Sequence, residues 1–448
     1  MDQNYNKFRL FVGSCFALLV TALTFAMRAK IEEVFGPVED GGIFGISKEA
    51  IGWAFSPAFW GFTIAMVLGG FVIDIVKTRT IVWAAFFLQL VGAILFILAD
   101  SKETLFAANV FIGLGNGSVE AAFNPLIATI YPKNKSKMLN RFHVWFPGGI
   151  VIGSLLAYLF MDKMEIGWQI YAGLLFIPLA IYGILFLGQK IPETERVTSG
   201  VSYRGMMKAI GAPFTIIIAM TFMILLAINV VTLPQGWMYL AMIAVISVIS
   251  IVEAAFIHKE NVIFPVIFTL MLLTSATELV TNQWVNALLG DAGVSPMLML
   301  AMISGIMAVG RFFAGSLIHR INPTGVLLLS SIFSAIGIYT LSLFNIPAVT
   351  IIGAIFFAIG ITYFWPTMLG FASEYIPRTG ALGLSLLGGA GFVSASMFMP
   401  LMGRVMEESG TQVALRSIGT LPIIMIIGFA ILFAVYRNKK PVELQQEG

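Results

Sequence analysis

The stretch "GGFVIDIVKTR", Gly69 to Arg79, has a counterpart in "AGSLIHRINPT", which begins at Ala314. The same offset aligns "ATIYP", which closes at Pro132, with "SEYIP", which closes at Pro377. Two matches at one spacing indicate that the chain contains two halves of shared ancestry. We therefore expect each half to fold as a bundle of the same design.

The composition indicates a membrane protein. The chain has 448 residues, of which 58% are hydrophobic and 11% charged, whereas soluble domains average about 25% charged residues. The net charge is only +3, and the basic residues lie in short loops between apolar segments, so we do not expect nucleic-acid binding. The single cysteine, Cys15, excludes an intramolecular disulfide. These features predict a polytopic integral membrane protein.

Apolar runs long enough to cross a bilayer, about 20 residues each, are frequent along the chain. They occupy residues 9–30, 51–75, 80–99, 104–130, 138–161, 168–188, 213–232, 238–257, 262–289, 296–318, 324–343, 347–374, 380–403 and 417–436. Only helices or a closed barrel satisfy the backbone inside lipid, and runs of this length are not strand-like. The sequence therefore predicts an all-α fold with about fourteen transmembrane helices.

The polar stretch Lys190 to Lys208 divides the runs. We expect an N-terminal six-helix bundle in residues 1–190, a cytoplasmic linker with an inserted helix pair in 191–260, and a C-terminal six-helix bundle in 261–448. Twelve crossings with an in-plane hairpin between the halves would also fit. In both arrangements the Lys and Arg residues of the short loops lie on one side. This asymmetry predicts cytoplasmic termini, and we expect a bacterial inner membrane.

The pattern in "GGFVIDIVKTR", a Gly followed after three residues by Asp and then basic residues, resembles the loop signature of the major facilitator superfamily. Lys77 stands where that signature usually has Gly. The stretch "GRFFAGSLIHRINP", Gly310 to Pro323, is similar to the second-half signature. The resemblance implies two six-helix bundles that rock around a central site. It also implies that a conformational latch forms from Asp74, Lys77, Arg79 and Arg311.

Within the superfamily, the chain most resembles the fucose-galactose-glucose:proton symporters. The resemblance rests on "VEAAFNP" from Val119, "LNRFHVWFPGG" from Leu139, "ATELVTNQW" from Ala276 and the stretch "GRFFAGSLIHRINP". A fucose-transporting member of that family carries an Asp late in its first helix, where this chain has Met27. That family is also usually twelve-helical.

The stretch "GNGSVEAAFNP" places Glu120 deep in the run 104–130. An acidic side chain in the membrane interior costs at least ~2.5 kcal/mol, so it should face a wet cavity or a partner. The resemblance implies that Glu120 binds a proton or the substrate. Asn124, one turn on, is suited to bind a sugar hydroxyl, and His143 to donate to a hydroxyl or share a proton with Glu120. A neutral, hydrogen-bonded structural carboxyl is the alternative.

Glu278 is the second deep acid, with Asn282 one turn on and Trp284 nearby. An acid, an amide and an indole are suited to bind the hydroxyls and the C–H face of a polyol. The repeat offset places Trp365 at the position of Glu120. We therefore expect these residues, with Glu120, Asn124 and His143, to bind substrate, and Glu120 or Glu278 to carry the coupling proton.

These features favour a secondary active transporter of a small polar solute, most simply a sugar, coupled to protons or to sodium. The alternative is a transporter of an organic anion or other small metabolite not coupled through Glu120. Arg28 favours this alternative, because it could bind an anionic substrate. A side chain that extends to the membrane surface would also explain the presence of an arginine at this position. A membrane-embedded enzyme or a channel would show clustered acids or a repeated pore ring.

The sequence contains neither of those patterns, and no GxxxxGK[ST] nucleotide loop. We therefore expect no enzyme activity, no cofactor and no metal site. The expected partners are the substrate, the coupling ion and the lipid bilayer, and the expected state is a monomer.

Overall fold

The computed structural model describes residues 5–131, 138, 141–192, 203–233, 235–259, 262–289, 293, 295–343 and 346–440. All regular elements in these ranges are helical. This confirms the all-α membrane fold predicted from the sequence. The runs of apolar residues form helices because lipid offers no other partner to the backbone groups.

The first half is a bundle around α1 and α5. Its elements are α1 (Lys7–Phe35), η1 (Val38–Asp40), α2 (Lys48–Phe55), α3 (Pro57–Val76), α4 (Thr78–Ile97), α5 (Lys102–Ile130), α7 (Trp145–Ala157), the π-helical turn η2 (Tyr158–Lys163), α8 (Trp168–Gly173) and α9 (Phe176–Phe186). Helices α3 and α4 pack against α5, and α7 and α9 pack against α1.

The second half repeats this design. Its elements are α14 (Ile263–Ser275), the π-helical turn η4 (Ala276–Val280), α15 (Thr281–Gln283), α16 (Val285–Leu289), α17 (Pro296–Leu343), α18 (Pro347–Ile361), α19 (Phe364–Tyr375), η6 (Pro377–Thr379), α20 (Gly380–Ser409) and α21 (Thr411–Tyr436). The label α17 covers two helices joined at Asn322, whose φ is 56° and which precedes Pro323. The Asn322 side chain accepts the N–H of Gly325 at 2.9 Å and so caps the second of them.

Three helices separate the halves: α11 (Tyr203–Ile210), α12 (Pro213–Ala227) and α13 (Gly236–Val252), the last extended by the π-helical turn η3 (Glu253–His258). Helix α12 packs against α20 and α13 against α14, so both lie on the second half. Glu253 accepts the backbone N–H of Thr215 at 2.9 Å and thereby caps α12. Much of the predicted linker, residues 193–202, lies outside the described residues.

In the described part of the chain, twelve helical segments are long and apolar enough to cross a membrane. The sequence-based count of about fourteen apolar runs is two higher. The two runs that make the difference form α5 and α12. Helix α5 is less apolar because it carries Asn109, Asn116 and Glu120, but its 29 residues are long enough to cross a bilayer. Helix α12 has only 15 residues, so the sequence-based number is slightly too high.

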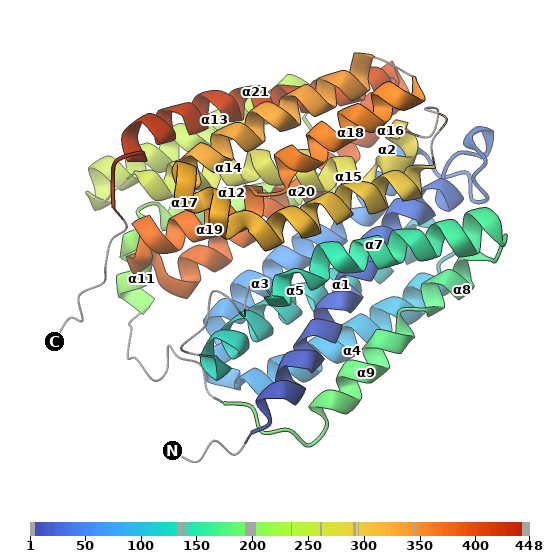
Figure 1. The fold of residues 1–448 in the computed structure, drawn as a ribbon, viewed down its shortest axis with the longest axis horizontal. Coiled ribbons are helices and arrows are strands. Elements are labelled where there is room, and N and C mark those ends of the chain that lie inside the picture. Colours follow the sequence, from blue (N-terminus) through green and yellow to red (C-terminus); the bar gives the residue numbers. More distant parts are fainter. Residues whose placement is uncertain are drawn as a thin grey trace.

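Figure 1 shows the two halves lying side by side, with both chain termini at the same end of the molecule. We call this the termini end, and the opposite end, where α1 ends and α2 begins, the far end. All the long helices run between these two ends (Figure 1). Across the interface between the halves, α20 packs against α2 and α3, and α17 packs against α7.

Buried polar side chains connect four helices inside the first half. Gln89 donates to Asn116 at 2.8 Å, and Tyr182 donates to Gln89 at 2.9 Å. Asn116 in turn donates to Thr24 at 3.1 Å. Because each of these groups is hydrogen-bonded, the network stabilises the bundle. Its role is structural.

Close helix contacts in the first half depend on glycine. A Cβ atom at Gly117 would lie 2.2 Å from the backbone oxygen of Phe62, and one at Gly113 would lie 2.2 Å from that of Pro57. Both contacts join α5 to α3. Small residues allow helix backbones to approach closely in membranes, so these glycines fix the position of α5 and of Glu120 on it.

We expect Gly117→Ala to destabilise the protein, because α3 must move to accommodate the added methyl group. Overpacking of this kind costs about 1–3 kcal/mol, and the unfolding temperature in detergent should fall. Gly148→Ala is the control, since a Cβ at that helical position has no atom within 4 Å. Equal unfolding temperatures for the two variants would contradict the assigned contact.

Candidate functional site

Aromatic side chains from both halves meet at the interface. The rings of Phe62 and Phe392 stack at a centroid distance of 3.7 Å, and Trp365 packs edge-on against Phe392 at 5.3 Å. Phe25 lies 5.1 Å from Phe146 and 6.2 Å from Phe392. Helices α1, α3 and α7 of the first half therefore contact α19 and α20 of the second through one aromatic cluster.

A small enclosed cavity borders this cluster. Its lining residues are Phe25, Phe146, Ile150, Glu278, Leu279, Asn282, Gln283, Leu300 and Met307. The volume is about 10 Å³, which is room for about one water molecule. The first half supplies apolar walls, and the second half supplies the polar groups.

Glu278 lies in the π-helical turn η4 and is buried. Its carboxylate is 3.4 Å from Nη2 of Arg311 on α17, and Arg311 also donates from Nε to the backbone oxygen of Thr362 at 3.0 Å. A π-helical turn adds a residue to the helix and is frequent at functional sites. Arg311, predicted from the resemblance to belong to a loop latch, is here the buried partner of Glu278.

A second polar cluster lies in the first half. Asn124 donates to Glu120 at 2.5 Å, and its oxygen is 3.0 Å from Nε2 of His143. That nitrogen is 4.0 Å from the Glu120 carboxylate. The side chains of Glu120 and His143 keep 12% and 31% of their surface exposed.

Arg28 is completely buried, and the explanation that its side chain reaches the membrane surface is wrong. Its Nε donates to Oε1 of Gln283 at 3.0 Å, and Gln283 donates back to the Phe25 carbonyl at 3.1 Å. The guanidinium carbon lies 4.6 Å from the Phe25 ring centre and 5.6 Å from that of Phe59. Gln283 was not among the site residues predicted from the sequence. The one sequence feature that points to it is its position next to Asn282.

The other predicted site residues have different surroundings. Asn282 lines the cavity, and its Oδ1 has no hydrogen-bond partner within the described ranges. Trp284 is completely buried and is absent from the cavity lining. Trp365 contacts the interface cluster through Phe392. The structure thus places Glu278 and Asn282 at one cavity, and Glu120, Asn124 and His143 in a cluster of their own.

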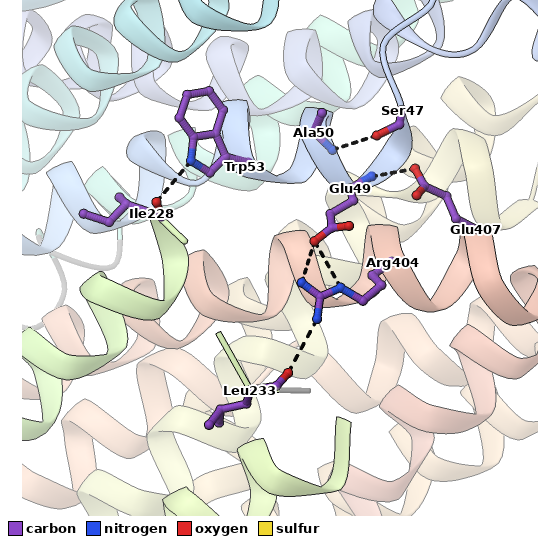
Figure 2. A network of polar contacts seen from close by, with 8 residues as sticks. All are labelled: Ser47, Glu49, Ala50, Trp53, Ile228, Leu233, Arg404 and Glu407. Carbon is purple, nitrogen blue, oxygen red and sulfur yellow. Dashed lines mark hydrogen bonds and ion pairs between the residues drawn. The ribbon is translucent and has the colours of Figure 1, made fainter. Parts of the chain in front are cut away.

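The halves are joined at the far end by polar contacts (Figure 2). Arg404 on α20 donates to Glu49 on α2 at 3.0 Å and to the backbone oxygen of Leu233 at 3.5 Å. The N–H of Glu49 donates to Glu407 at 2.8 Å, and Trp53 donates to the Ile228 carbonyl at 3.4 Å. Figure 2 shows that Arg404 lies between α2 and the loop after α12. The far end is therefore closed.

The remaining latch residues lie at the termini end. Lys77 and Arg79 are exposed at the junction of α3 and α4. The side chain of Asp74 lies outside the described residues, so its predicted contact stays a prediction. Lys77 has a φ of 68°, a conformation that favours glycine. This explains physically why the signature usually has Gly at this position.

Two helical bundles that enclose a polar cavity between them, closed at one end, define a membrane transporter of the secondary type. Residues 10–289, well over half of the chain, match the Major Facilitator Superfamily. The chain belongs to this superfamily.

Solved structures share the fold. A POT family transporter in complex with a thioalcohol-conjugated peptide is 14% identical, with a TM-score of 0.69 and 96% of each chain covered. The nucleoside transporter NupG is 14% identical with a TM-score of 0.63, covering 95% of this chain and 98% of its own. The human proton myo-inositol cotransporter is 27% identical over 136 residues. That match covers 30% of this chain and one fifth (20%) of the cotransporter.

Proposed function

We propose that this protein transports a small hydroxylated solute, a sugar or a close derivative of one, by alternating access coupled to protons. The observation that carries the proposal is the enclosed cavity between the halves, which Glu278, Asn282 and Gln283 line together with Phe25. Carboxylate and amide groups bind hydroxyls, and aromatic walls pack against sugar C–H groups. The myo-inositol cotransporter, by its name, couples a polyol to protons.

In this proposal the termini face the cytoplasm, across a bacterial inner membrane, and the far end faces outside. The Glu49–Arg404 contact then closes the outer side, while Glu120 and His143 keep some exposed surface. Asp74, Lys77 and Arg79 would close the termini end in the opposite state. The substrate would thus reach the site from alternate sides of the membrane.

Glu120 is the proposed proton site, because it lies in the membrane, is partly exposed and has no basic partner within ion-pair distance other than His143 among the described residues. Glu278 is the reserve proton site, but its carboxylate already lies 3.4 Å from Nη2 of Arg311, so we assign it to substrate binding. In the proposed site Asn282 forms part of the second-half wall, and Trp365 contacts the aromatic cluster through Phe392.

The direct test is uptake by the purified protein in proteoliposomes. Radiolabelled glucose, galactose, fucose and myo-inositol, together with gluconate, glucuronate and galacturonate, would be offered with and without an inward proton gradient. We expect at least one of these solutes to accumulate only when the gradient is present, and protein-free liposomes serve as the control. Failure of all seven to accumulate would contradict the proposed substrate class.

A further inference from the structure

Arg28 has more hydrogen-bonding capacity than the protein uses. Its Nε is bonded to Gln283, but Nη1 and Nη2 have no partner among the residues that the structure describes. The side chain has no exposed surface, so bulk water does not satisfy these groups. Burying a charged group whose N–H donors have no hydrogen-bond partner is energetically unfavourable.

The aromatic contacts compensate only part of this cost. Cation–π contacts with Phe25 and Phe59 attract the guanidinium group to the faces of the two rings. The free energy needed to remove a charge from water is larger, even after the protein relaxes. In the described ranges no carboxylate lies within 4.0 Å of Arg28, and Glu278 is paired with Arg311. The guanidinium group therefore lacks a counter-ion in this conformation.

Arg28 lies directly beside the cavity. Phe25, over whose ring its guanidinium stacks, and Gln283, which holds its Nε, both line that cavity. On the same wall Asn282 presents an unpartnered acceptor oxygen. A ligand that enters as the cavity widens would meet the two unpartnered NH2 groups of Arg28 and, at Asn282, an acceptor for a hydroxyl.

We propose that the transported solute carries a carboxylate that pairs with Arg28, so that the substrate is a small hydroxylated acid such as a sugar acid. A guanidinium group binds a carboxylate through two parallel hydrogen bonds, which matches the two free nitrogens. A neutral sugar would leave the buried charge uncompensated. This inference rests on the proposed function and narrows its substrate class.

The test compares acids with their neutral counterparts on the full-length protein: galacturonate with galactose, glucuronate and gluconate with glucose. Binding is measured by the shift in unfolding temperature, and uptake in proteoliposomes. We expect at least one acid to bind about 10- to 100-fold more tightly than its neutral partner, as a charged hydrogen bond contributes about 1.5–3 kcal/mol.

Arg28→Gln should remove this preference. Without ligand it should be at least as stable as the wild type, because it removes an uncompensated buried charge. Arg28→Lys keeps the positive charge but lacks the two parallel NH2 groups of the guanidinium, so it should bind the acid with intermediate affinity. Arg416→Gln, at an exposed position of α21, is the matched control and should behave as the wild type.

Two results would overturn the inference while leaving the proposed function intact. One is that the protein takes up a neutral sugar in response to the gradient but does not take up the corresponding sugar acid. The other is an acid preference that persists in Arg28→Gln. If the wild-type protein takes up none of the neutral or acidic solutes in response to the gradient, the proposed function is overturned as well.

Discussion

Glu120→Gln is expected to abolish accumulation of substrate against a gradient while preserving binding and energy-independent exchange. The variant is neutral at every pH and keeps a hydrogen-bonding group beside Asn124. It therefore imitates the protonated state but cannot release a proton. Accumulation is measured in proteoliposomes under a pH gradient, and exchange with substrate on both sides without one.

Glu103→Gln is the matched control, because Glu103 lies on the same helix, α5, and is exposed at its first turn. It should accumulate substrate as the wild type does. If Glu120→Gln still concentrates substrate in response to a pH gradient, Glu120 is a structural carboxyl. Its bonds to Asn124 and its approach to His143 would then account for its presence in the membrane.

Glu278→Gln is expected to weaken substrate binding and to destabilise the protein, because it leaves Arg311 buried and unpaired. Breaking a buried ion pair by removing one partner costs about 3–5 kcal/mol. The Glu278 and Arg311 side chains keep only 6% and 10% of their surface exposed, so solvent screens the pair little. Thermal unfolding in detergent and equilibrium binding of the transported solute are the measurements.

The double variant Glu278→Gln, Arg311→Met separates stability from binding. With both charges removed, much of the lost stability should return, whereas binding should stay weak because the site carboxylate is still absent. A double-mutant cycle with Arg311→Met gives the coupling energy of the pair. Additive stability losses would show that the 3.4 Å contact does not stabilise the protein.

The sequence alone determined the fold class. Lipid allows only helices or a closed barrel, and the length of the apolar runs favours helices. The match between the stretches at Gly69 and Ala314 indicated two related halves. The prediction of fourteen spans was too high. Counting apolar residues does not separate α12, with 15 residues, from a full crossing.

The sequence also indicated most of the polar residues in the membrane. Glu120 and Glu278 stand out because acids are costly there, and periodicity placed Asn124 and Asn282 one turn from them. The bonds that these residues make were harder to predict. The Asn124 bond to Glu120 follows from helical spacing, but the ion pair of Glu278 joins it to Arg311, 33 positions away.

Only the tertiary structure showed the surroundings of Arg28. From the sequence, a basic residue near the end of a helix extends to the surface. In the folded protein α1 packs against α5, α7 and α9 and against α15 and α16 of the second half. Arg28 is completely buried there, and Gln283, 255 positions away, accepts its Nε–H. Burial and cross-interface pairing depend on how helices from distant parts of the chain pack together, which no local pattern of residues records.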